Sequence, residues 1–169
     1  FLELDGAKEV GVEFYSLSKS FNTTGARISF FIGNKTIVSA FEKLRSQYDL
    51  GMFLPIQRAA IEALKTNRDI ILEQQKIYEE RRNILCEGLT NIGWSVKKSK
   101  GTMFVFAKIP DKYNNSMEFT IELLAKANVL VTPGIAFGTL GDKYVRFALV
   151  KDKDELAKAT AIAEGLAAG

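Results

Sequence analysis

The feature that most constrains the fold is a long stretch without helix breakers. Residues 57–87 contain no glycine or proline, the two residue types that helix interiors tolerate least. Residues 67–69 (Asn-Arg-Asp) offer a boundary and a cap, so we expect a short helix before them and a long helix after them. We expect Gly88 and Gly93 to end the long helix. Its apolar seam, at roughly heptad spacing, consists of Ile70, Ile71, Ile77, Tyr78, Ile84, Leu85 and Leu89.

Two short apolar runs precede this stretch and predict buried strands at residues 10–18 and 28–32. Asn34 is a suitable cap for a helix over residues 35–48. One face of that helix is apolar, and we expect it to pack into a core. This face consists of Ile37, Val38, Phe41, Leu44 and Tyr48.

Strands and helices also alternate after the long helix. Ser116 is the expected cap of a helix that ends at Lys126. Asp152 or Asp154 can cap a last helix that ends at Leu166. The inward side chains of the first of these helices are expected to be Phe119, Leu123 and Leu124. The predicted strands cover residues 94–98, 102–109, 129–132 and 144–150. This alternation predicts an α/β or α+β fold.

Composition is that of an ordinary globular protein. The 169 residues suffice for a domain with a core, and 47% are apolar and 25% charged. The net charge of +3 is small and spread along the chain, so it gives no case for a nucleic-acid partner. No apolar run approaches the length of a membrane span. The single cysteine, Cys86, fits a reducing cytoplasm and is expected to be a small buried hydrophobe. Histidine is absent, which excludes histidine-dependent triads and histidine-ligated zinc.

The candidate chemistry lies in the polar segment that separates the first two predicted strands. The amine of Lys19 can form a Schiff base with an aldehyde when it is neutral. Ser16 and Ser18 can donate hydrogen bonds to phosphate oxygens, and Arg27 can bind two such oxygens in a fork. A lysine and a phosphate clamp together suit pyridoxal phosphate. From spacing alone, an ordinary surface lysine and a solvated arginine remain the alternative.

Residues 16–27, Ser-Leu-Ser-Lys-Ser-Phe-Asn-Thr-Thr-Gly-Ala-Arg, closely resemble the cofactor-lysine segment of the class I/II aminotransferases, which are pyridoxal-phosphate enzymes of fold type I. The resemblance continues in one order along essentially the whole chain, at residues 55–60, 101–106, 131–138 and 144–149. Residues 6–10 and 78–85 are most similar to the LL-diaminopimelate aminotransferase branch. The implied fold is α/β with an α+β small domain, in which a long helix packs on a small sheet.

The resemblance assigns roles to individual residues. Lys19 would carry the cofactor and then move a proton between the substrate Cα and the cofactor. Ser16, Ser18 and Arg27 would hold the cofactor phosphate. Arg146 would bind the α-carboxylate of the substrate. By spacing alone, an edge strand with Arg146 in water is the alternative.

The resemblance also implies a partial chain in two parts. Residues 1–46 would be a remnant of the large cofactor-binding domain, with two strands and a helix, and residues 47–169 the small C-terminal domain. The aspartate that pairs with the pyridine nitrogen would precede Phe1. We therefore expect the chain by itself to lack useful transaminase activity. Residues 133–134 and 137–138 would line the substrate side.

The implied reaction moves an amino group between an amino acid and a 2-oxo acid. LL-diaminopimelate and 2-oxoglutarate, in lysine biosynthesis, are the first substrates to consider. An aspartate- or aromatic-type aminotransferase and a lyase of the same fold are alternatives. A ligand-sensing domain of a transcription regulator is the alternative that is not an enzyme. The resemblance further implies a cytoplasmic homodimer with no metal site and no nucleic-acid or membrane partner.

Overall fold

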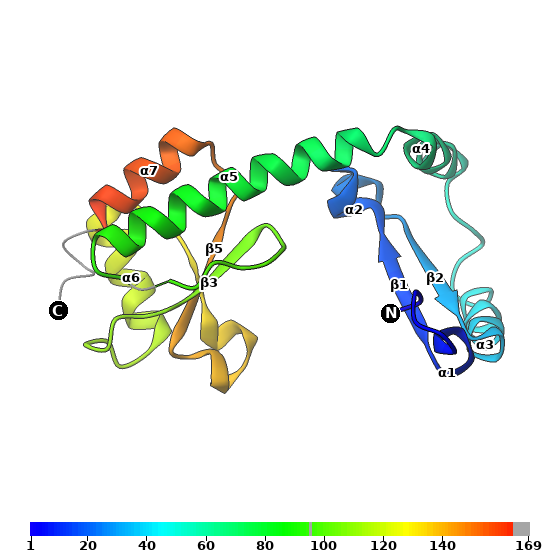
Figure 1. Ribbon diagram of the computed structural model, residues 1–169. Coiled ribbons are helices and arrows are strands. Elements are labelled where there is room, and N and C mark those ends of the chain that lie inside the picture. The colour runs from blue at the N-terminus through cyan, green and yellow to red at the C-terminus, as the bar shows by residue number, and fades with distance from the viewer. Residues whose placement is uncertain (95, 164–169) are drawn as a thin grey trace. The chain divides into compact units, whose positions relative to one another are not determined.

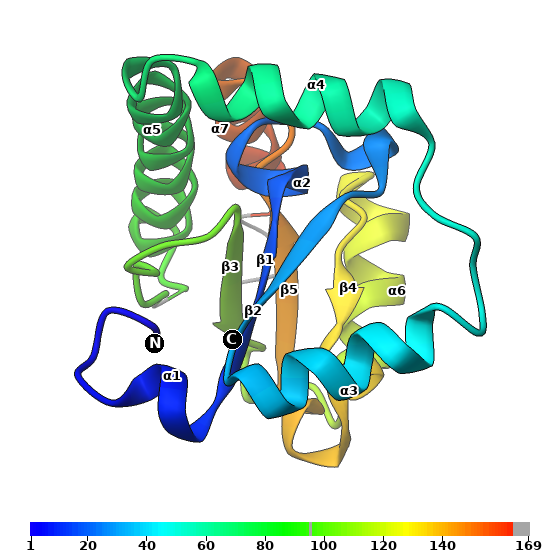
Figure 2. The same cartoon turned by 90° about the vertical axis from the view of Figure 1, so that its right-hand side faces the viewer.

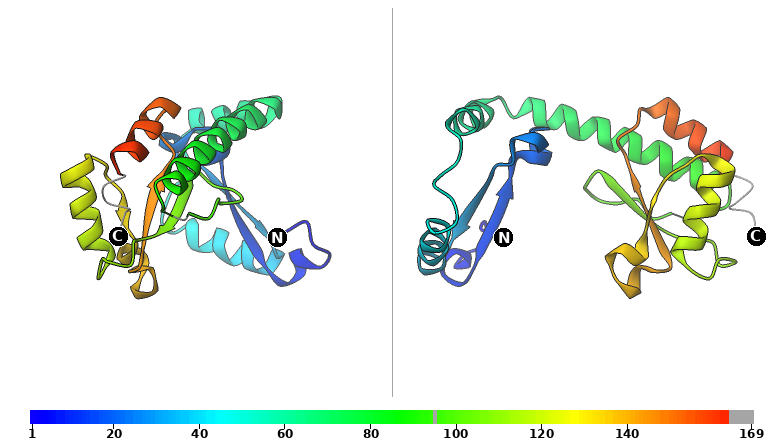
Figure 3. Two further views of the ribbon diagram at one scale, coloured as in Figure 1. Left: turned by 60° about the vertical axis from the view of Figure 1, so that its left-hand side comes forward. Right: turned by 180° about the vertical axis from the view of Figure 1, so that it is seen from behind.

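The computed structural model describes residues 1–94 and 96–163. The chain divides into two compact units, which we call unit 1, Phe1–Leu72, and unit 2, Glu73–Gly169. Figure 1 labels their helices and strands, and Figures 2 and 3 show the same elements from other sides. The described helices and small antiparallel sheets confirm the mixed helix and sheet class that the sequence predicts. In the part of the chain that is described, no helix has both the length and the apolar character needed to cross a membrane.

Unit 1 is built on a two-stranded antiparallel hairpin. Val12 pairs with Gly33 at one end of the ladder, and Ser16 pairs with Ser29 at the other. Both predicted strands therefore form, but the expectation that they are buried was wrong, because no residue of β1 or β2 is buried, and Phe14 is 67% and Ile32 43% exposed. The elements of unit 1 are α1 (Ala7–Val10), β1 (Val12–Ser16), α2 (Leu17–Ser20), the 3₁₀ turn η1 (Thr24–Ala26), β2 (Ser29–Gly33), α3 (Lys35–Arg45) and α4 (Leu54–Lys65).

Helix α3 begins where the sequence predicts. The Oδ1 atom of Asn34 accepts a hydrogen bond from the Ile37 N–H, at 3.1 Å, and caps the helix. The expected burial of its apolar face was wrong, because no residue of α3 is buried and Leu44 is 54% exposed. Only the Phe41 ring makes a close aromatic contact, with the Phe31 ring 4.5 Å away. Ile37 on the same face is also exposed, at 42%.

The long helix α5 (Asp69–Asn91) confirms the strongest sequence prediction. Its first N–H, that of Asp69, donates to Asn67 Oδ1 at 3.2 Å, as the predicted cap requires. The expectation that Gly88 ends the helix was wrong, since α5 continues through it to Asn91. Gly88 is needed for packing instead, because a Cβ there would lie 2.5 Å from the Thr160 hydroxyl oxygen.

Unit 2 contains a three-stranded antiparallel sheet in the order β3-β5-β4, formed by Phe104–Lys108, Tyr144–Ala148 and Thr132–Pro133. The predicted strand at 94–98 was wrong for its described residues, none of which is in a strand. Trp94 is buried, and its indole N–H donates to the Lys108 carbonyl at 2.6 Å. The Trp94 side chain is therefore buried and hydrogen-bonded, although its described neighbours form no strand. Ser95 lies outside the described residues.

The helices of unit 2 close one face of this sheet. Helices α6 (Ser116–Ala127) and α7 (Lys153–Ile162) are capped by Asn115 and Asp152, so the expectation that Ser116 is the cap was wrong. Leu124 is 44% exposed, which corrects its predicted inward orientation. The predicted end of the last helix at Leu166 lies outside the described residues. The buried core includes Leu85 and Leu89 of α5, Val105 and Ala107 of β3, Phe119 and Leu123 of α6, Val145 and Phe147 of β5, and Leu156 of α7.

Candidate cofactor and carboxylate sites

The first candidate site is the lysine loop, residues 16–28, which joins the paired ends of β1 and β2. Because Ser16 pairs with Ser29 in the hairpin, the two ends of this loop lie side by side. The Ser16 hydroxyl accepts from the Ser18 N–H at 3.2 Å and donates to the Ile28 carbonyl at 3.5 Å. The hairpin register therefore brings Ser16 next to Ile28 and Ser29, the two residues that follow Arg27 in the sequence.

Two threonine hydroxyls fasten the loop from within. Thr23 Oγ1 donates to the Leu17 carbonyl at 3.0 Å, and Thr24 Oγ1 donates to the Ser18 carbonyl at 3.1 Å. Leu17, which is 1% exposed, anchors the same turn in the small core of unit 1. These side chains hold the backbone around Lys19 in one conformation, a supporting role that the sequence analysis did not assign. The sequence signal that could have predicted this role is the group of hydroxyl side chains that follows the first strand.

The backbone around the loop's arginine is strained. Asn22 and Arg27 both have φ of 52°, in the left-handed region that side chains other than glycine rarely adopt. Such conformations cost on the order of 1–3 kcal/mol and persist where the surroundings over-determine them. Arg27 Nη1 donates to the Thr24 carbonyl at 3.2 Å, which places the guanidinium back over the loop.

The loop thus carries four groups with complementary chemistry. Ser16, Lys19 and Arg27 are exposed, whereas Ser18 is 9% exposed and helps to form the turn. Hydroxyls and a guanidinium are donors that suit a phosphate, and an accessible lysine amine suits an aldehyde. No group of residues that could hold a metal ion occurs among the residues described.

The second candidate site is Arg146 of β5, in unit 2. Its neighbours Val145 and Phe147 point into the core, so Arg146 lies on the opposite face of the sheet. The guanidinium carbon is 4.2 Å from the centroid of the Phe104 ring and 4.6 Å from that of Phe137. Contacts of this kind stabilise a desolvated cation by roughly 1–2 kcal/mol.

The guanidinium of Arg146 has N–H donors that could still bind a ligand. Its Nη2 donates to Thr132 Oγ1 on β4 at a long 3.5 Å. Its Nε is buried and has no hydrogen-bond partner among the described residues. An unpaired buried donor is unfavourable, and a carboxylate bound in a fork would satisfy it. The edge-strand alternative was wrong, because β5 is the central strand and Arg146 is half-buried.

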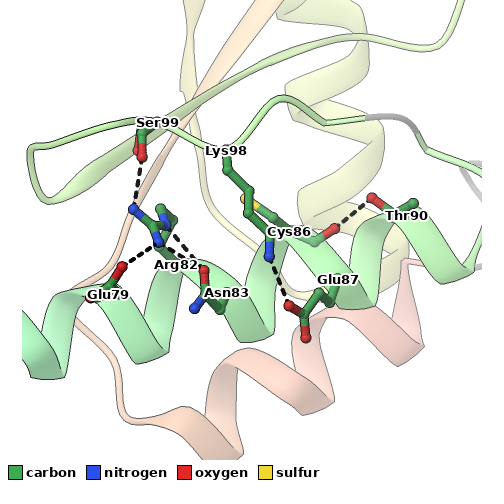
Figure 4. A network of polar contacts seen from close by, with 8 residues as sticks. All are labelled: Glu79, Arg82, Asn83, Cys86, Glu87, Thr90, Lys98 and Ser99. Atoms are coloured by element: carbon green, nitrogen blue, oxygen red, sulfur yellow. Dashed lines mark hydrogen bonds and ion pairs between the residues drawn. The ribbon is translucent and has the colours of Figure 1, made fainter.

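The backbone carbonyl of Phe104 belongs to a polar network that begins on α5. Figure 4 shows Arg82 between Glu79, Asn83 and Ser99. Arg82 Nη1 donates to the Ser99 carbonyl at 2.9 Å, and Nη2 pairs with Glu79 Oε1 at 2.9 Å. Ser99 Oγ in turn donates to the Phe104 carbonyl at 3.1 Å. The turn before β3 is therefore fastened to the long helix.

Comparisons with known proteins identify the family to which the chain is similar. The family profile for aminotransferase class I and II matches residues 2–162. Glutamate-pyruvate aminotransferase AlaC of Escherichia coli is 45% identical over 160 residues, which are 94% of this chain. An LL-diaminopimelate aminotransferase of Dehalococcoides mccartyi is 44% identical over 161 residues, or 95% of this chain.

Solved structures show the same fold. BacF from Bacillus subtilis superposes with a TM-score of 0.93 at 36% identity, covering 98% of this chain and 44% of that chain. A probable N-succinyldiaminopimelate aminotransferase from Thermus thermophilus gives a TM-score of 0.92 at 32% identity and also covers 98% of this chain and 44% of that one.

The chain belongs to the class I and II aminotransferase family, since the profile spans nearly all of it. Members of this family use pyridoxal phosphate and act on amino acids and 2-oxo acids. The chain spans about two fifths of the curated relatives it matches, 39% of the Escherichia coli protein and 41% of the Dehalococcoides protein.

Proposed function

We propose that this chain forms part of a pyridoxal-phosphate-dependent aminotransferase. The observation that carries the proposal is the hairpin register that places Ser16 beside the Ile28 carbonyl, next to Arg27, with the exposed Lys19 on the turn between them. A phosphate and an aldehyde on one small molecule match these donors and this amine. The bound cofactor would supply the electron-withdrawing ring that makes a substrate Cα–H acidic.

In this proposal the residues of the lysine loop have different roles. Ser16, Ser18 and Arg27 hold the phosphate, and the internal hydrogen bonds of the loop fix their positions in advance, which lowers the cost of binding. Lys19 Nζ would hold the cofactor aldehyde and would also be the base that takes the proton from the substrate Cα. Arg146 binds the substrate α-carboxylate, for which its buried and unpaired Nε is suited.

The substrate class follows from the relatives. One of them is named a glutamate-pyruvate aminotransferase and another an LL-diaminopimelate aminotransferase, at nearly equal identity. We propose LL-diaminopimelate with 2-oxoglutarate as the first pair to test and glutamate with pyruvate as the second. Steady-state kinetics of the full-length protein with both pairs will separate them, because the true pair will have the higher kcat/KM.

Labelling of Lys19 tests the proposed cofactor role. The full-length protein, loaded with pyridoxal phosphate and reduced with borohydride, should carry a covalent phosphopyridoxyl label on the peptide that contains Lys19. The Lys19→Ala variant should carry none, and the matched Lys35→Ala variant, another exposed lysine of unit 1, should label as the wild type does. A label on a different lysine, or none in the wild type, would disprove the proposal.

Three further statements complete the proposed function. Residues 1–46 belong to the cofactor domain and residues 47–169 to the small domain.

The 169-residue chain assayed alone with pyridoxal phosphate and glutamate should show no useful turnover, and turnover equal to that of intact relatives would refute this. The full-length protein is a cytoplasmic homodimer, which the exposed apolar side chains of unit 1 and the single cysteine support; sedimentation of the full-length protein tests the dimer.

A further inference from the structure

The Phe137 ring, which contacts the Arg146 guanidinium, belongs to a loop whose two ends lie against each other. We call residues 134–142 the Phe137 segment; it contains the 3₁₀ turns η2 (Gly134–Phe137) and η3 (Thr139–Gly141). A Cβ on Gly134 would lie 2.0 Å from the Gly141 carbonyl oxygen and 2.5 Å from that of Tyr144. The two ends of the segment are thus in direct backbone contact, and no side chain fits between them.

A buried polar network fastens the same segment to helix α6. Ser116, which is 0% exposed, donates its hydroxyl to Asp142 Oδ1 at 2.8 Å and accepts from the Ile135 N–H at 3.1 Å. The Ser116 N–H donates to the same Asp142 oxygen at 3.1 Å. One hydroxyl therefore ties together both ends of the Phe137 segment, at Ile135 and at Asp142.

The exposed part of the segment depends on this anchor for its position. Phe137 is 52% exposed, and its ring contacts the Arg146 guanidinium and, edge to face, the Phe106 ring at 6.1 Å. The position of the Phe137 ring therefore depends on the anchored backbone beneath it as well as on its edge-to-face contact with Phe106. A shift of that backbone would free the arginine to adopt other rotamers.

We propose that Ser116 and Asp142 are positioning residues for carboxylate binding by Arg146, acting through the Phe137 ring. This inference rests on the proposed role of Arg146. The hydrogen bonds of Ser116 and Asp142, which we call the anchor, fix the Phe137 segment. The Phe137 ring in turn fixes the plane of the Arg146 guanidinium. The guanidinium can then bind a carboxylate without losing further side-chain freedom. Losing the anchor raises the cost of binding the substrate and leaves the chemistry at Lys19 intact, which is the kinetic pattern of lost uniform binding.

The test measures steady-state kinetics of the full-length protein loaded with pyridoxal phosphate, using glutamate as the amino donor. Ser116→Ala and Asp142→Ala should each raise KM about tenfold with kcat within about twofold of wild type. Asp142→Asn keeps an oxygen that can accept both hydrogen bonds, so its KM should stay near that of wild type. Thr120→Ala is the matched control, because it removes a buried hydroxyl of α6 that, among the described residues, donates to the Ser116 carbonyl and makes no bond to the Phe137 segment.

The outcomes separate this inference from the proposed function. Arg146→Lys should raise KM more than any anchor variant; if it leaves KM unchanged, the proposed role of Arg146 is wrong and this inference falls with it. If Arg146→Lys raises KM but Ser116→Ala and Asp142→Ala do not, only the positioning role is refuted. A rise in KM for Thr120→Ala equal to that for Ser116→Ala would also refute it, because the effect would then be general loosening of α6.

Discussion

The two units hold their candidate site residues by different physical means. Among the described residues, the buried core of unit 1 consists of Leu17, Ile28 and Ala60, whereas that of unit 2 joins a sheet to three helices. Lys19 therefore lies on a turn that side-chain hydrogen bonds fasten. Arg146 lies on a central strand whose alternate residues are fully packed.

The difference shows what each site depends on. Apolar side chains in α3 and the chain that follows it, such as Leu44 and Tyr48, are exposed within unit 1, and hydrophobic burial supplies most of the free energy of folding. Unit 2 buries its apolar face and should be the more stable of the two. Four measurements can break or sharpen this comparison.

Truncation of a core residue should have the largest effect. Phe119 is 0% exposed and contacts the rings of Trp94 and Tyr113, so Phe119→Ala should lower the free energy of unfolding by about 3–5 kcal/mol. Leu44→Ala on α3 should change it by no more than about 0.5 kcal/mol, because this side chain is already half in water. Urea denaturation of the chain, followed by circular dichroism, measures both. Equal losses would contradict the comparison.

Addition of one methyl group should have the next largest effect. Gly88→Ala would place a Cβ 2.5 Å from Thr160 Oγ1, and overpacking of this kind costs about 1–3 kcal/mol of stability. Gly25→Ala in unit 1 meets no atom within 4 Å and should cost about 0.5 kcal/mol or less.

A double variant checks the cause. Thr160→Ala, added to Gly88→Ala, should restore part of the lost stability, because it removes the hydroxyl and the methyl group that the new Cβ meets. If the two losses simply add, contact between α5 and α7 is not the reason for the glycine.

Removal of a helix cap should cost a similar, smaller amount in each unit. Asn34→Ala and Asp152→Ala should each lower the free energy of unfolding by about 1 kcal/mol, because each removes the oxygen that accepts an N–H of the first turn. Asn34→Asp keeps that oxygen and should retain most of the stability. A loss for Asn34→Asp as large as that for Asn34→Ala would instead assign the stabilisation to the bond from Asn34 Nδ2 to the Glu9 carbonyl, at 2.6 Å.

The smallest effect should be a pH dependence from Cys86. Burial raises the pKa of this thiol above its ordinary value, so the folded state holds the proton to higher pH than the unfolded state does. Its contribution to stability is complete below the ordinary thiol pKa, roughly 8.5, and is lost as the pH rises through the folded value. Unfolding at pH 7 and pH 10 should show a decrease that Cys86→Ala reduces. An unchanged decrease would assign the pH effect to other groups.

Local signals in the sequence predicted the elements well. The breaker-free stretch gave α5, the caps at Asn34 and Asp152 are real, and the resemblance around Lys19 identified the family. The cap of α6 was missed by one residue, but two other errors arose where a distant partner decides the outcome. Gly88 seemed a helix end because nothing local shows that Thr160 will pack against it, and residues after Trp94 seemed a strand because nothing local shows that its indole will bond to Lys108.

The sequence by itself determined the family of this protein, since the order of the lysine, hydroxyls and arginine in residues 16–27 resembles that of the family and needs no fold to be recognised. Only the tertiary structure decided how Arg146 is held. The residues concerned come from three separate segments: Phe104 from β3, Ser116 from α6, and Phe137 and Asp142 from the Phe137 segment. Hydrogen bonds and ring contacts act over a few ångströms in space, and the fold alone brings these segments within that range.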